Sequence, residues 1–275
     1  MNAVLVIAGR EIREGIRNRW ILATTLVLAL LALSLAFLGS APVGAVKASA
    51  LTVTVVSLSS LTIFLVPLIA LILSYDGLVG EAENGTLLLL LAYPVSRWQI
   101  VLGKFLGHTA ILTFATIIGY GAAGVAVAQG QGWDMEGGRA FAAMIGSSIL
   151  LGAVFAALGT LVSAAARERS IAAGIGVALW LFFVIVFDMT LLGVLVVDKT
   201  GVLGVDAVAY LLMLNPADVY RLFNLTGFGA VGGLTGMASL SRDLDIAPAI
   251  LLAVMVLWIA LPLALAGVIF RRRPL

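Results

Sequence analysis

The residues in this sequence that could carry chemistry are few, and their types exclude most kinds of active site. The chain contains no cysteine and a single histidine, His108. Thiol nucleophiles, disulfides and iron–sulfur clusters therefore lack ligands, and one chain cannot supply a Ser-His-Asp triad or a multi-histidine metal site. The seven methionines are scattered, and methionine more often fills a core than binds a metal. We expect no catalytic residue, no metal site and no cofactor in this chain.

Asp188 is the one ionisable residue deep inside a long apolar segment. A charged group at membrane depth is costly, so such residues are treated by default as functional. The sequence offers Asp188 no basic partner within the same kind of segment. It is expected either to stay protonated and bond a neighbour such as Thr190, or to meet its copy in a dimer. Two roles for Asp188 stay open. It could make a structural polar contact, or it could act at a functional hinge or contact a substrate.

The elements that must position these residues are membrane spans. Apolar residues make up 62% of the chain and charged residues 11%, against roughly 45–50% and 25% in ordinary soluble domains. Six stretches reach the roughly 17–25 residues that cross a bilayer. They are residues 20–38, 51–73, 105–128, 140–164, 171–197 and 247–270. The sequence therefore predicts an all-α integral membrane protein with six transmembrane helices.

The positions of lysine and arginine predict the orientation of these spans. Most of them lie beside span ends on one side of the membrane, where the positive-inside rule has force. That side is expected to be the cytoplasm, with both termini on it, at a bacterial inner membrane. Residues 1–19 are amphipathic and predict a helix lying along the inner surface, the alternative being a simple topogenic charge cluster. The small net charge of +2 does not suggest nucleic acid as a partner.

The loop at residues 77–104, between the second and third spans, is the most informative stretch. Between residues 81 and 97 it contains Glu81 and Glu83, then five consecutive leucines at 87–91, and then Pro94. The leucine run is too short to cross a membrane, and Ser96 followed three residues later by Gln99 is a capping box for the next long helix. The pattern predicts one short, half-apolar cytoplasmic helix that lies either on the membrane or against a partner.

The loop at residues 198–246, on the outer side, is too long for a simple hairpin. Asn215 followed by Pro216 predicts a helix start, because Asn caps helices and Pro favours their first position. Two short helices are therefore expected here. One interpretation is a docking platform for a periplasmic partner, with Asp218, Tyr220 and Arg221 exposed. The other is a re-entrant pair that seals the bundle.

The pattern Glu81-x-Glu83-x-Gly-Thr86-Leu, followed by Pro-Val-Ser-Arg97 and Gly-Lys104, resembles the same loop of ABC-2-type permeases, the membrane halves of ABC transporters. The resemblance covers the whole chain and implies one permease domain, residues 1–275. It also implies that the 77–104 loop carries a coupling helix that contacts a separate cytoplasmic ATPase. The residues expected at that contact are Glu81, Glu83, Thr86, Leu87, Leu88 and Arg97. No Walker A motif occurs in the chain, so ATP and Mg would be bound by the partner.

A narrower resemblance rests on Asn215-Pro216-Ala-Asp218-Val-Tyr220-Arg221, on Ser-Tyr-Asp at 74–76 and on the segment from 103 to His108. These elements are similar to those of permeases that serve maturation of nitrous oxide reductase in denitrifying bacteria. The resemblance implies three protein partners besides the lipid bilayer: a NosF-like ATPase, a NosD-like periplasmic copper-handling protein and a second copy of the chain. The expected function is transmission of force to the periplasmic partner. Export of a small lipid-like or sulfur-containing substrate is the alternative.

Overall fold

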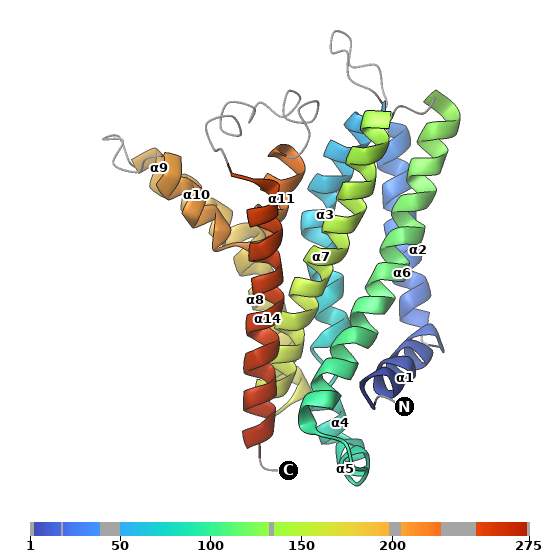
Figure 1. Ribbon diagram of the computed structural model, residues 1–275, viewed down its shortest axis with the longest axis vertical. Coiled ribbons are helices and arrows are strands. Elements are labelled where there is room, and N and C mark those ends of the chain that lie inside the picture. The colour runs from blue at the N-terminus through green and yellow to red at the C-terminus, as the bar shows by residue number, and fades with distance from the viewer. Residues whose placement is uncertain are drawn as a thin grey trace.

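The structure, a computed structural model, describes residues 3–17, 19–38, 50–131, 135–197, 205–226 and 246–273. Every regular element within these ranges is a helix. The long helices are α2 (Arg19–Leu38), α3 (Ala50–Ser74), α6 (Arg97–Gln131), α7 (Met135–Ala165) and α14 (Pro248–Arg272). They run side by side in one bundle (Figure 1). The all-helical architecture expected from composition is confirmed.

Five helical stretches of the described chain are long and apolar enough to cross a membrane. They are Thr54–Glu83, Arg97–Gln129, Met135–Ala165, Arg169–Val196 and Pro248–Arg272. They coincide with the second to sixth spans expected from the sequence. The first expected span, residues 20–38, coincides with the 20-residue helix α2, and its role as a sixth span stays a prediction.

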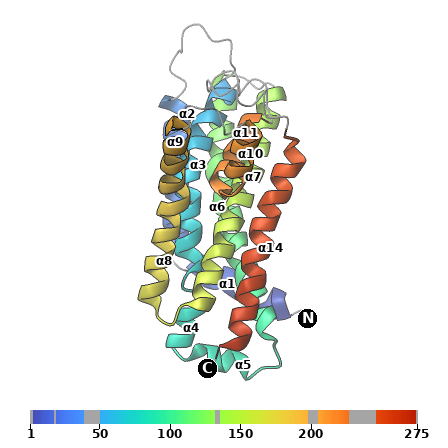
Figure 2. The ribbon, with the colours of Figure 1, turned by 90° about the vertical axis from the view of Figure 1, so that its left-hand side faces the viewer.

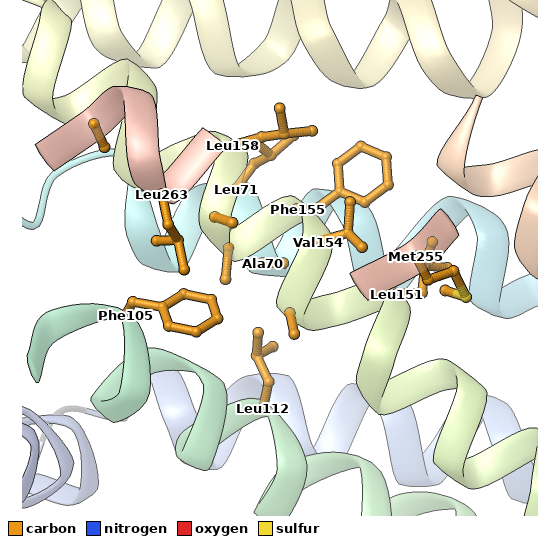
Figure 3. Packing of buried hydrophobic residues seen from close by; sticks show 14 of the residues in the cluster. Ala70, Leu71, Phe105, Leu112, Leu151, Val154, Phe155, Leu158, Met255 and Leu263 are labelled. Atoms are coloured by element: carbon orange, nitrogen blue, oxygen red, sulfur yellow. The ribbon is translucent and has the colours of Figure 1, made fainter. Parts of the chain in front are cut away.

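Helix α7 is the centre of the bundle. It packs against α3, α14 and α6, and every residue from Leu151 to Thr160 is buried. Small residues allow this close packing: a Cβ added to Gly152 would lie 3.2 Å from the Val66 side chain. Figure 3 shows the apolar contacts around α7, where Phe155 and Leu158 lie near side chains of the neighbouring helices. Small side chains let helices approach closely in membranes, where there is no hydrophobic force between helices.

The fifth expected span is a helix with an irregular centre. It consists of α8 (Arg169–Leu181), a π-helical turn η1 (Phe182–Val186) and α9 (Phe187–Val197). α8 contacts α3 and α7, whereas α9 leans away from the bundle together with α10 (Val205–Met213) (Figure 1). Figure 2 shows α8 and α14 on opposite sides of α7. A π turn inside a membrane helix marks a place where the ordinary ladder of hydrogen bonds is interrupted.

Both termini lie at one end of the bundle, here called the terminus end, together with α1 (Ala3–Arg17), α4 (Val79–Glu83) and α5 (Thr86–Leu91) (Figure 1). The opposite end, here called the far end, holds α11 (Pro216–Thr226). α1 packs across α6, where Ile7 meets Gly103: a Cβ on that glycine would lie 2.7 Å from the Ile7 Cβ. Helix α1 thus buries Ile7 and Ala8 in the bundle while Leu5 and Ile16 stay exposed, and its predicted place along the membrane surface stays a prediction.

Candidate functional site

The loop between α3 and α6 forms two short helices instead of the single one expected. α4 contains Glu81 and Glu83, and α5 contains the leucine run. Gly85 separates them with a φ of 72°, in the left-handed region that favours glycine. The expected capping box is confirmed at the start of α6: the Ser96 amide donates to Gln99 Oε1 at 2.9 Å, and the Gln99 amide donates to Ser96 Oγ at 3.3 Å.

Helix α4 is attached to the central helix α7 through one hydroxyl group. Ser163 Oγ accepts hydrogen bonds from the amides of Leu78, at 2.9 Å, and Val79, at 3.0 Å. Ser163 and both of its partners are buried. Because the first amides of a helix have no partner within it, this contact satisfies groups that would otherwise be costly to bury.

A buried lysine ties three elements together beside α4. Lys104 Nζ of α6 lies 2.7 Å from Glu11 of α1 and 2.9 Å from Glu81 of α4. Only 3% of the Lys104 side chain is exposed, so the two carboxylates supply the compensation that a buried charge requires. Arg10 of α1 also approaches Glu81, at 3.5 Å. We call Glu11, Glu81, Lys104 and His108 the lysine cluster.

The histidine of the lysine cluster also faces α1. His108 lies in the first third of α6, and its Nε2 is 3.4 Å from Glu11 Oε2. Burial raises the pKa of Glu11, but the His108 hydrogen bond and the positive charge of Lys104 outweigh burial and lower that pKa to about 2. Glu11 is therefore held ionised. A cavity of about 250 Å³ adjoins the cluster and is also lined by Asp76 and Arg169.

Asp76 and Glu83 attach the same loop to α8. The Arg169 guanidinium pairs with the Asp76 carboxylate. The Arg169 amide donates to Glu83 at 2.8 Å. The loop is thus held by α1, α6, α7 and α8. Its position therefore depends on how these four helices are arranged.

The six residues expected at an ATPase contact divide into two groups. Leu87 is 1% exposed, Glu81 is engaged in the lysine cluster, and Arg97 donates to the carbonyls of Phe270, Arg271 and Arg273 at the end of α14. These three side chains hold the protein together within the chain, and their contact with an ATPase stays a prediction. Glu83, Thr86 and Leu88 are exposed.

The exposed surface of the loop extends beyond the expected residues. Leu88, Leu89 and Tyr93 are 58%, 69% and 69% exposed and lie at the tip of the terminus end. We call these three residues the α5 tip. Leu89 and Tyr93 were missed because a leucine run gives no periodic signal that separates buried from exposed positions. An apolar tip of this kind is typical of a surface that a partner covers.

At the far end, the predicted start of α11 is confirmed. Asn215 Oδ1 accepts from the Ala217 amide at 3.0 Å, and Pro216 is the first residue of the helix. Asn215 Nδ2 donates to Asp218 at 2.8 Å and to the carbonyl of Phe183, also at 2.8 Å. Phe183 belongs to the π-helical turn, so one asparagine both caps α11 and joins it to the irregular centre of the fifth span.

Asp188 has a basic partner that the sequence did not reveal. Arg221 lies 2.9 Å from Asp188 and 2.6 Å from Asp218. The expectation of a bond to Thr190 is wrong, since that hydroxyl donates to the carbonyl of Val186 at 2.7 Å. We call Asp188, Asp218 and Arg221 the arginine triad. Its members come from α9 and α11, which lie far apart in the sequence.

The residues expected to dock a periplasmic partner are mostly buried. Tyr220 and Asn215 have no exposed area, Asp218 has 1%, and Pro216 is buried as well. The expectation that Asp218 and Tyr220 are exposed anchors is therefore wrong. α11 packs between α7, α14 and α3, which favours the alternative of a re-entrant helix that seals the bundle. Only Arg221 keeps partial exposure, 31% of its side chain.

The Tyr220 hydroxyl lies in a buried group of neutral polar side chains. It is 3.1 Å from Ser148 Oγ, and Asn224 donates to Ser147 at 3.0 Å. Tyr120 on α6 lies 2.8 Å from Thr62 on α3. Among the described residues no group of three or more His, Asp or Glu side chains is arranged to hold a metal ion. The interior of the far end is thus built from hydroxyl and amide contacts.

The chain is similar to known membrane permeases over its whole length. The model of a family described as "ABC-2 family transporter protein" matches residues 5–275. The chain is 47% identical over 279 aligned residues to a probable ABC transporter permease protein NosY of Pseudomonas aeruginosa, with all of both chains covered. It is 46% identical to a protein of the same name from Stutzerimonas stutzeri, with 99% of both chains covered. This chain is a multi-pass membrane protein that belongs to the ABC-2 family of transporter permeases.

Proposed function

We propose that this chain is the force-transmitting permease of a complex that supports copper-site maturation of nitrous oxide reductase. A separate, NosF-like ATPase binds ATP and Mg and hydrolyses the ATP, and a NosD-like periplasmic protein receives the resulting motion. The chain has six spans, lies in the bacterial inner membrane as one domain with both termini in the cytoplasm, and works with a second copy of itself. Full-length similarity to NosY permeases supports this proposal.

The observation that carries the proposal is that the exposed, apolar α5 tip lies next to a helix, α4, that buried contacts hold in place. The α5 tip is available to an ATPase at the terminus end, while α4 beside it is fixed by Ser163 and the lysine cluster. A push on α5 therefore moves α4 together with the helices that hold it, because the contacts are buried and short. A loose loop would absorb the same push without passing it on.

Helix α7 provides the route across the membrane. Ser163 holds α4 at one end of α7, and Ser147 and Ser148 hold α11 toward the other. Fifteen residues separate Ser163 from Ser148, which is about 22 Å along a helix that rises 1.5 Å per residue. Since α7 is the most buried of the five candidate spans, its displacement moves the whole bundle.

We place the surface that contacts the periplasmic partner on α10 instead of α11. Tyr210 is 70% exposed and Leu214, just after α10, is 59% exposed, whereas Tyr220 is buried. Aromatic residues at an exposed end are common anchors in protein interfaces. We assign the contact with the NosD-like protein to Tyr210 and Leu214, with Arg221 as the remaining polar candidate from the original set.

Export is the second candidate, and the buried polar group at the far end favours it. Thr116 and Tyr120 of α6 are buried, the Tyr120 hydroxyl lies 2.8 Å from Thr62 of α3, and Ser59 Oγ is buried without a hydrogen-bond partner. A small lipid-like or sulfur-containing substrate would need such polar contacts on its path. Most of these hydroxyl groups bond one another, however, which favours a structural role for the group.

The test is to remove contacts that hold α4 in place while leaving the α5 tip unchanged. We expect Ser163→Ala combined with Glu81→Gln to leave ATPase binding and ATP hydrolysis near wild type, while the copper content of co-expressed nitrous oxide reductase falls sharply. Ser170→Ala, an exposed serine at the start of α8, is the matched control and should change nothing. Full copper loading in the double variant would contradict the proposal. ATP-driven uptake of a radiolabelled sulfur compound by inverted vesicles, lost in Tyr120→Phe, would instead support export.

A further inference from the structure

A groove opens at the terminus end between the C-terminal ends of α7 and α14, and no residue of the 77–104 loop lines it. Its volume is about 510 Å³. Its walls are formed by Ala164, Ala165, Arg167, Ile269, Arg272 and Arg273. Three arginines from two helix ends therefore converge on one space, with apolar side chains between them.

The charge of this groove is not balanced by the described residues. Arg10, Lys104 and Arg169, at the same end of the molecule, each pair with a carboxylate. No such partner occurs in the described chain for the side chains of Arg167 and Arg272, which are exposed. Arg273 makes only a long contact of 3.5 Å with the carbonyl of Ser163. The neighbouring carboxylate, that of Glu168, accepts from Ser170 at 3.4 Å. Counted over the described residues, the groove therefore carries an excess of positive charge, which favours an anionic ligand.

The apolar side of the groove continues along α14. Leu261, Leu265 and Val268 are 54%, 53% and 44% exposed on this membrane helix. Exposed leucine and valine on a spanning helix face hydrocarbon. A ligand that fills the groove thus meets guanidinium groups at the membrane surface and apolar side chains on the way into the bilayer.

We propose that this groove binds the headgroup of an anionic phospholipid, with its phosphate among Arg167, Arg272 and Arg273 and its acyl chains along α14. Arginine forms strong, paired hydrogen bonds with phosphate oxygens. Basic pockets between membrane helices, next to the surface, suit anionic headgroups. A soluble acidic partner would satisfy the arginines but would leave the apolar walls uncovered.

The test compares lipids on purified protein in detergent, read by native mass spectrometry and by the shift of the unfolding temperature. Dioleoylphosphatidylglycerol should bind and raise the unfolding temperature, while dioleoylphosphatidylcholine and inorganic phosphate should do neither. Arg167→Gln with Arg272→Gln should weaken phosphatidylglycerol binding by about 30-fold, from the usual contribution of each basic residue near an anionic lipid. The matched control, Arg271→Gln with Arg139→Gln, removes the same charge outside the groove and should bind as wild type.

Three outcomes would overturn the proposal. Equal weakening in both double variants would show a general charge effect. An equal response to inorganic phosphate would define an anion site without lipid. Unchanged phosphatidylglycerol binding in Arg167→Gln with Arg272→Gln, accompanied by loss of the ATPase from the complex, would assign this face to the ATPase.

Discussion

The two ends of the bundle hold their helices together with different chemistry. At the terminus end the contacts are between full charges, with Lys104 shared by Glu11 and Glu81 and Arg169 paired with Asp76. At the far end most contacts are between neutral groups, as between Tyr220 and Ser148. The arginine triad is the exception there. It lies where α9 leaves the bundle, and its arginine keeps 31% exposure.

Under the proposed function, this difference suits the terminus end to receive force from an ATPase. Charged pairs that are desolvated are costly to separate, because each partner would remain buried and unpaired. Single hydrogen bonds between hydroxyl groups in membranes contribute less, on average about 0.6 kcal/mol. The loop that would receive the ATPase is thus held rigidly, while the far end can adjust through small exchanges of hydrogen bonds.

Removal of the shared lysine should have the largest effect on stability. Lys104→Met leaves Glu11 and Glu81 buried without their partner, a loss expected to cost about 3 kcal/mol in the free energy of unfolding. Thermal unfolding in detergent measures it. Lys104→Met with Glu11→Gln should recover part of the loss, since one unpaired charge is gone. A single variant as stable as wild type would show that the lysine cluster is not a rigid anchor.

The arginine triad should respond in the same way but less strongly. Arg221→Met leaves Asp188 and Asp218 unpaired, and partial exposure of the triad reduces the expected cost to about 2 kcal/mol. Adding Asp188→Asn should restore some stability. If Arg221→Met were more damaging than Lys104→Met, the far end would be the more rigid of the two, against the contrast drawn here.

Acid should weaken the terminus end before the far end. Glu11 has its pKa lowered from the usual 4.5 to about 2. Its contribution is therefore complete above about pH 4.5 and is lost as pH falls toward 2. Unfolding temperature measured across this range should drop less in Glu11→Gln than in wild type, because the substituted side chain no longer titrates. Parallel curves for the two proteins would show that Glu11 contributes nothing to acid sensitivity.

The smallest effect is expected from a single hydroxyl at the far end. Tyr220→Phe removes the contact with Ser148 and keeps the ring, so the expected cost is about 0.6 kcal/mol. The matched change Tyr120→Phe, which removes the contact with Thr62, should cost about the same. A loss comparable to that of Lys104→Met would mean that the hydroxyl group at the far end is as important as the lysine cluster.

Local patterns in the sequence predicted local structure well. Five of the six expected spans, the capping box of Ser96 and Gln99, and the cap formed by Asn215 depend on neighbouring residues, and each coincides with a feature of the structure. The pairing of Asp188 with Arg221 joins residues 33 positions apart through the fold, which no local pattern encodes. For the same reason Tyr220 was taken for an exposed anchor, since polarity in an outer loop suggests exposure unless other helices cover it.

Within the loop at residues 77–104, the sequence did not separate the exposed side chains from the buried ones. The resemblance to ABC-2 permeases pointed to residues 77–104 as a whole. Glu81 points inward because it pairs with Lys104, and Leu87 points inward because it packs in the hydrophobic core. Both contacts depend on how α1 and α6 pack. The exposure of Leu89 and Tyr93 follows from the position of α5 at the tip of the terminus end, which the sequence alone does not reveal.

The most direct test of the account is site-specific photocrosslinking at the α5 tip. A benzoylphenylalanine at Leu89, which is 69% exposed, should crosslink the ATPase subunit in membranes of cells that express the whole complex. The control is Met135, which is 68% exposed at the opposite end of the bundle and should give no such product. Equal crosslinking at both positions, or none at Leu89 in a complex that still hydrolyses ATP, would contradict the assignment of this loop as the element that receives force.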